Sequence, residues 1–106
     1  MGTYRRINVA SGRSLEQLAH YSRALRVGDV VLQSGTTAID RQGGVRDVGD
    51  VAKQVETIMT IAEWSMDKAG GKLADVVRSR VYVTDVTVAT EGARAVALGE
   101  IGRAHV

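Results

Sequence analysis

The feature that most constrains the fold is a helical pattern of apolar residues in the middle of the chain. From residue 51 to residue 69, apolar side chains recur every three or four positions, as they do on one face of an α-helix of about five turns. These residues are Val51, Val55, Ile58, Met59, Ala62, Met66 and Ala69. Asp50 can cap the first free amides, and Gly70-Gly71 can end the helix in a left-handed turn. The apolar face, with its methionines and Trp64, predicts packing on a sheet and needs no cofactor to explain it.

The residues before this helix predict an antiparallel β-meander. Gly28-Asp29 separates two β-compatible runs, which indicates a hairpin because glycine tolerates the positive φ of a two-residue turn. A second turn is expected at residues 40–44, and residues 10–20 are expected to form a loop. The expected extended segments are residues 4–9, 21–27, 30–32 and 34–39.

The residues after the helix predict one more strand and one more helix. Val77, Ser79, Val81 and Val83 alternate with polar or aromatic residues, the period of a strand with one apolar face. A second helix follows, with Thr87 or Thr90 as its N-cap. Its expected apolar side comprises Ala89, Ala93, Val96, Ala97, Ile101 and Ala104.

The resulting order is β-β-β-α-β-α, an α+β fold in which two helices can cover one face of a sheet. The length of 106 residues predicts a single domain, residues 1–106. The second helix reaches residue 106 with no glycine stop, from which we expect the domain to be incomplete at its C-terminus.

Composition excludes several classes of function. The chain has no cysteine, which excludes disulfides, thiolate metal sites and cysteine nucleophiles, and its two histidines are far apart. We therefore expect neither metal nor cofactor. The net charge is only +2, and basic residues are interspersed with acidic ones, which argues against a nucleic-acid site. No run of about 18 apolar residues could span a membrane, and no secretory segment is evident, so the expected location is the cytoplasm.

Three blocks of sequence together resemble the Rid (YjgF-like) family. Residues 21–29, YSRALRVGD, followed by residues 30–35, VVLQSG, are similar to the family pattern P-Y-S-x-A, a hydrophobic residue, x-V-G, a short strand and S-G. Ala69-Gly70-Gly71 with residues 73–77, LADVV, is similar to the pattern A-G-x-x, a hydrophobic residue, x-D-V-V. Residues 81–85, VYVTD, end in the family's T-D. The order and spacing of the blocks make the resemblance specific.

The resemblance implies a chorismate-mutase-like fold, normally completed by two further strands, and a homotrimer with ligand pockets between subunits. It also implies hydrolysis of reactive enamines or imines, as by a 2-iminobutanoate/2-iminopropanoate deaminase, to a carbonyl compound and ammonia. Other members carry the labels endoribonuclease or translation inhibitor. The family's substrate-binding arginine and water-linked glutamate belong to the further strands, so they have no counterpart among these residues. His20 in place of proline, and Thr36 in place of glutamine, mark a divergent branch.

The residues that match the family's pocket motifs are Tyr21, Ser34 and Gly35, to which Thr36 is added by position. Tyr21 can donate its hydroxyl or form a wall, and the hydroxyl of Ser34 and the amide of Gly35 can meet a carboxylate or carbonyl oxygen. Arg80 is a candidate anion-binding residue on the polar face of its strand. The alternative is that Tyr21 packs at an interface, that Ser34-Gly35 permits a bend, and that Arg80 is solvated or in an intersubunit ion pair. No catalytic residue is assigned.

Three functional hypotheses remain open at this stage. The first is an enzyme acting on small imines or enamines in a cleft between subunits. The second is a trimer that binds a small-molecule or carboxylate ligand without hydrolysing it. The third is an RNA-directed activity, which salt-dependent binding to RNA would support. The dispersed charge argues against it.

Overall fold

The computed structural model describes residues 5–40 and 42–104, and for residues 97–104 it describes the backbone alone. Three short strands, β1 (Arg6–Val9), β2 (Ala24–Val27) and β3 (Val30–Gln33), form an antiparallel sheet in the order β1-β2-β3. Gly28 has a φ of 58° in the tight turn that pairs Val27 with Val30. This confirms the predicted hairpin and meander. The second turn is also present, since Ile39 and Val45 form a bridge and the amide of Asp40 donates to the carbonyl of Gly44.

The long helix α2 (Val51–Lys68) has the predicted ends. The Asp50 side chain accepts a hydrogen bond from the amide of Lys53 at 3.0 Å, and Gly70 has a φ of 84° directly after the last turn. Val55, Met59, Ala62 and Ala69 of the predicted apolar face are buried. The helix is therefore defined by both of its predicted caps as well as by its periodicity.

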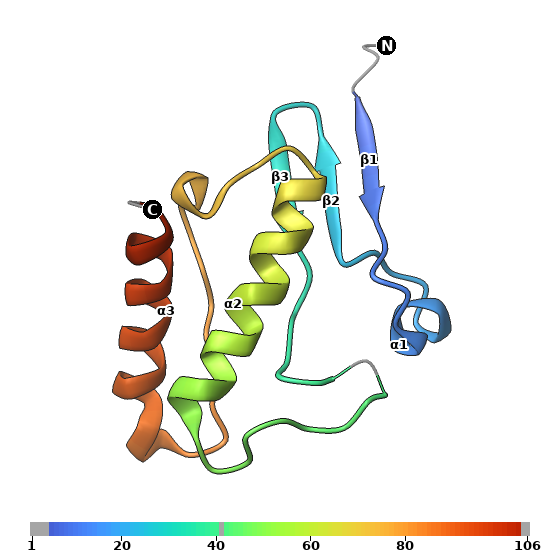
Figure 1. The fold of residues 1–106 in the computed structure, drawn as a ribbon. Coiled ribbons are helices and arrows are strands. Elements are labelled where there is room, and N and C mark those ends of the chain that lie inside the picture. Colours follow the sequence, from blue (N-terminus) through green and yellow to red (C-terminus); the bar gives the residue numbers. More distant parts are fainter. Residues whose placement is uncertain (1–4, 41, 105–106) are drawn as a thin grey trace.

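Two small apolar clusters hold the elements together. Ala69, just beyond the C-terminal end of α2, packs on the sheet against Val9 and Ala24. Val55 and Met59 on α2 pack with Leu73 of the 3₁₀ turn η1 (Leu73–Asp75), together with Ala95 and Val96 of α3 (Ala89–Ala104). Figure 1 shows α3 beside α2, which contacts β3. The main partners of α3 are thus α2 and η1, and the contact with the sheet is made through α2.

One face of the sheet lies toward α2, and among the described residues no helix packs on the other face. Because side chains alternate along a strand, the register places six residues on the second face. We call it the outer face: Arg6, Asn8, Leu25, Val27, Val30 and Leu32. Val30 and Leu32 are each 57% exposed there.

The predicted strand at residues 77–83 is not formed. Residues 77–84 run as irregular backbone with no strand partner among the described residues, and β3 pairs with β2 alone. Figure 1 shows this segment between η1 and η2 (Val86–Val88). The expected apolar side is retained in part: a Cβ on Gly92 would lie 3.7 Å from Val81 and 3.5 Å from Val83. Alternation shows that a segment suits a sheet, but a strand also needs a hydrogen-bonding neighbour.

Two further predictions are corrected by the structure. Residues 10–20 are not all loop, because Ser14–Leu18 form a short helix, α1, whose exposed Leu15 and Leu18 give no amphipathic signal. The predicted N-cap of the second helix, Thr87 or Thr90, is also wrong. The 3₁₀ turn η2 leads directly into α3, and the side chain of Asp85 caps that turn. On α3, Gly92, Ala95 and Val96 turn inward whereas Ala93 is exposed. The side chains of Ala97, Ile101 and Ala104, also assigned to that face, lie outside the described residues.

Candidate functional site

The hairpin brings the two pocket motifs to the same end of the sheet. Tyr21 lies shortly before β2 and Ser34 directly after β3. Since β2 and β3 are antiparallel neighbours, the start of one lies beside the end of the other. The amide of Ser34 donates to the carbonyl of Arg23 at 3.1 Å, which extends the ladder by one step.

Tyr21 and Ser34 line a shallow hollow of about 350 Å³. It opens at the end of the outer face, and its walls combine apolar side chains of the sheet with polar groups. The lining residues are Arg6, Asn8, His20, Tyr21, Ser22, Leu25, Leu32, Gln33 and Ser34. Leu25, Leu32 and the Tyr21 ring supply the apolar part of the lining, and the other lining side chains are polar, the kind of group that fixes the orientation of a small molecule.

The hydroxyl groups at this end of the sheet are held by short contacts. Ser34 Oγ donates to the carbonyl of Ser22 at 2.6 Å, and Asn8 Nδ2 donates to Ser22 Oγ at 3.0 Å. Because the proton of the Ser34 hydroxyl is used in this bond, its oxygen remains available as an acceptor. Gly35 is exposed, and a Cβ added there would meet nothing within 4 Å, so its backbone is open to an approaching group.

Thr36 sits at the centre of a polar network rather than on the wall of the hollow. Its Oγ1 accepts from Gln33 Nε2 at 3.3 Å and from Arg23 Nη1 at 3.4 Å, and donates to the carbonyl of Ser34 at 2.9 Å. Gln33 Oε1 in turn accepts from the buried Ser65 on α2 at 2.6 Å. The network therefore ties the Ser34–Thr36 segment to the long helix.

Arg80 is not brought together with the other candidates. It is exposed in the irregular segment between η1 and η2, and it lines neither of the two hollows described here. Arg78 is exposed in the same segment. His20 lies at the hollow with a φ of 56°, whereas His105 lies outside the described residues.

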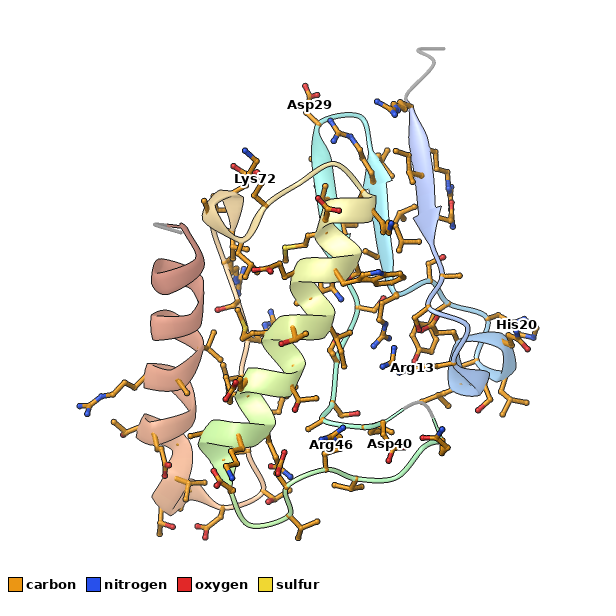
Figure 2. All side chains as sticks on the ribbon, in the orientation of Figure 1. Arg13, His20, Asp29, Asp40, Arg46 and Lys72 are labelled. Atoms are coloured by element: carbon orange, nitrogen blue, oxygen red, sulfur yellow. The ribbon has the colours of Figure 1, made fainter. Side chains whose placement is uncertain are left out.

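A second hollow, of about 430 Å³, contains none of the motif residues. It lies between α2 and the segments that carry Arg13, Asp40 and Arg46, which Figure 2 shows on one side of the molecule. Asp40 Oδ1 accepts from the amides of Gln42 and Gly44, at 2.9 and 2.8 Å, and so stabilises the turn. The second hollow is larger than the first, but it is not the better candidate site, because no residue of the pocket motifs lines it.

Sequence reasoning did not identify Arg23, Glu16, Gln33 or Asn8 at this end of the sheet. Arg23 occupies the variable position between Ser22 and Ala24 in the motif, so the resemblance gives it no role. It is buried, as is Glu16, whose carboxylate accepts from the amide and hydroxyl of Ser11. In the part of the chain that the structure describes, no three His, Asp or Glu side chains come together as metal ligands, and no helix is long and apolar enough to cross a membrane.

Comparison with known proteins decides the family. The sequence profile described as Endoribonuclease L-PSP matches residues 11–100, most of the chain. The chain belongs to the YjgF/Rid family. Its α+β fold agrees, since a solved Mycobacterium tuberculosis member of the YjgF/YER057c/UK114 family superposes with a TM-score of 0.77 at 37% identity, over 93% of this chain and 76% of that one. A solved chain from Entamoeba histolytica, at 22% identity, shares the fold with a TM-score of 0.73, over 92% of this chain and 78% of that one.

Two curated YjgF/Rid proteins are similar to this chain over part of their length. A RutC family protein of Pyrococcus abyssi is 32% identical over 62% of this chain and 52% of its own length. A protein of Acinetobacter baylyi named 3-aminoacrylate deaminase RutC is 31% identical over 64% of this chain and 54% of its own length. The chain thus spans about half the length of the curated relatives that it matches.

Proposed function

We propose that this protein hydrolyses small reactive enamines or imines to a carbonyl compound and ammonia, in a pocket that includes the Tyr21–Ser34 hollow. The observation that carries the proposal is that two motif segments, separated along the chain, meet at one hollow with polar and apolar walls. Family membership and the deaminase name of the Acinetobacter baylyi relative support it.

The chemistry asks little of the protein. The enamine carbon takes a proton to give the imine, the oxygen of water bonds to the C=N carbon, and the C–N bond then breaks to release ammonia. For 2-aminoacrylate, the sum is one water consumed and one pyruvate and one ammonia formed. A site accelerates these steps by holding the substrate and one water and by placing hydrogen-bonding groups at the developing charges.

The described residues can supply part of such a site. Tyr21 offers a hydroxyl or a flat wall, Ser34 Oγ an acceptor and Gly35 an open backbone amide. Arg80 would have to reach the site from a neighbouring copy, because it lies apart from the hollow in one chain. The homotrimer implied by the resemblance would bring segments of different copies together, and its contact surface on this chain would be the exposed outer face.

The deciding experiment measures ammonia release from freshly generated 2-aminoacrylate and from bulkier imines. Tyr21→Phe and Ser34→Ala are expected to lower kcat/KM by about ten-fold or more, the usual effect of removing one placed polar group. Ser79→Ala, exposed in the irregular segment, is the control. Absence of ammonia release above the spontaneous rate from every imine would reject the deaminase.

The second candidate is a trimer of the same fold that binds a ligand in the hollow without turning it over. The hydrogen bond that the Ser34 hydroxyl already donates to the carbonyl of Ser22 favours it, because it leaves that group no proton to give. Saturable binding of pyruvate with no ammonia release from any imine would support this alternative.

A further inference from the structure

Arg23 is buried in an environment that does not satisfy it. Its side chain is 6% exposed, and the Glu16 carboxylate is 3.6 Å from its Nε, an ion contact that is too long for a hydrogen bond. Its Nη1 reaches Thr36 Oγ1 at 3.4 Å. Nε and Nη2 have no acceptor within the described part of the chain.

Such a group adds little to the stability of the fold. A buried charge loses its hydration, and a buried N–H without an acceptor adds a further cost. Apolar side chains of similar volume are often neutral or stabilising in place of a buried ion pair. The position of Arg23 is therefore better explained by what its guanidinium group touches.

The guanidinium group contacts both pocket segments. The Tyr21 ring lies over it, with its centroid 5.2 Å from Cζ, a distance typical of a cation–π contact. On the other segment, Nη1 meets Thr36, whose hydroxyl also bonds the carbonyl of Ser34. Arg23 does not line the hollow, so it acts on the site through its neighbours.

We propose that Arg23, paired with Glu16, is a positioning residue: it holds the Tyr21 ring and the Ser34–Thr36 segment in register and thereby sets the affinity of the hollow for its ligand. This role rests on the proposed function, because it concerns the same hollow. It adds a residue to which the family motif gives no role, and it connects the pocket to α1, which carries Glu16.

The test compares Arg23→Met with Arg26→Met, a matched change in the same part of the sheet. Arg26 donates to the carbonyls of Ala69 and Gly28 and contacts neither Tyr21 nor Thr36 in the bonds described. Arg23→Met is expected to weaken pyruvate binding and to raise KM for 2-aminoacrylate by about ten-fold, because a misplaced pocket loses affinity. It is also expected to lower Tm, because it leaves the buried carboxylate of Glu16 without its ionic partner, so the comparison with Arg26→Met rests on affinity. Arg26→Met is expected to lower Tm and to leave the affinity of the folded protein unchanged.

A second variant and a spectroscopic measurement keep the proposal falsifiable if Arg23→Met does not fold. Arg23→Lys keeps a positive charge beside Glu16 but lacks the planar group that contacts both the Tyr21 ring and Thr36. Its affinity for pyruvate should therefore lie between those of Arg23→Met and the wild-type protein. The ring resonances of Tyr21 in NMR spectra should shift in both Arg23 variants and not in Arg26→Met. Wild-type affinity and unshifted Tyr21 resonances in Arg23→Lys would overturn the proposal.

The same data separate this inference from the proposed function. If the wild-type protein neither binds pyruvate nor releases ammonia, the deaminase fails, and shifted Tyr21 resonances in the Arg23 variants would still support the positioning contact. If the wild-type protein is active and the Arg23 variants match it in KM and in the Tyr21 resonances, the deaminase stands and the role of Arg23 is rejected.

Discussion

A single carboxylate shapes the turn that leads into α3. Asp85 Oδ1 accepts from Thr87 Oγ1 at 2.7 Å and from the amide of Thr87 at 2.9 Å. The hydroxyl bond first, and then the amide bond, lower the pKa of Asp85 below its ordinary value of 3.8, because both favour the ionised carboxylate. A pKa lowered by folding means that the bonds stabilise the turn above pH 3.8 and that this contribution is lost as the pH falls through the lower, folded value.

Thr87→Ala removes the larger of the two causes. The pKa of Asp85 should then rise toward 3.8, and the turn at η2 should loosen at a higher pH than in the wild-type protein. An NMR titration of the Asp85 side chain measures this directly, with Thr90→Ala as a control because Thr90 does not bond Asp85 in the bonds described. An unchanged Asp85 midpoint in Thr87→Ala would show that the hydroxyl bond does not exist in solution.

At the scale of elements, the end of α2 depends on one glycine and one arginine. Gly70 and Gly49 both have positive φ, 84° and 83°, so alanine at either site costs about 1–2 kcal/mol of backbone strain. At Gly49 the new Cβ meets nothing, whereas at Gly70 it would lie 2.8 Å from Arg26 Nη1, which donates to the carbonyl of Ala69. Gly70→Ala should therefore reduce the free energy of unfolding by about 1 kcal/mol more than Gly49→Ala, the value of the displaced hydrogen bond. Denaturant unfolding measures both, and equal losses would mean that Arg26 moves aside at no cost.

The elements that could be predicted from the sequence are those whose signals are local. The caps of α2, its apolar period and the Gly28-Asp29 hairpin are written in neighbouring residues, and all are present. The short α1 and the unpaired residues 77–84 could not be predicted. Helix α1 depends on the burial of Glu16 beside Arg23. A strand at residues 77–84 would depend on a hydrogen-bonding neighbour, which a local sequence pattern cannot identify.

The candidate site follows the same division. Tyr21 and Ser34 could be placed together from motif and hairpin topology, since antiparallel strands bring those ends together. The roles of Gln33 and Arg23 could not, because their side-chain partners come from α2 and α1, which pack against the sheet only in the folded chain. Site residues that act through long-range packing leave no signal in a local motif.

At the scale of the whole molecule, buried and exposed apolar surfaces are unevenly distributed. The two clusters centred on Ala69 and on Met59 are small, whereas Val30 and Leu32 on the outer face and Val77 and Tyr82 in the irregular segment are well exposed. Contiguous exposed apolar residues on a sheet face are a common mark of an interface. The distribution favours association of copies through the outer face, as proposed for the trimer.

Leu32→Glu tests this use of the outer face. Leu32 is 57% exposed on the edge strand of that face, beside Leu25 of the central strand, and a charge buried there against another copy would be strongly unfavourable. We expect the wild-type protein to self-associate and Leu32→Glu to shift it to monomers by about ten-fold or more in the dissociation constant. Leu18→Glu, at a leucine on α1 that is 76% exposed and lies off the outer face, should leave association unchanged. Light scattering over a range of protein concentrations measures all three. A monomeric wild-type protein, or equal association of the two variants, would show that copies do not meet through the outer face.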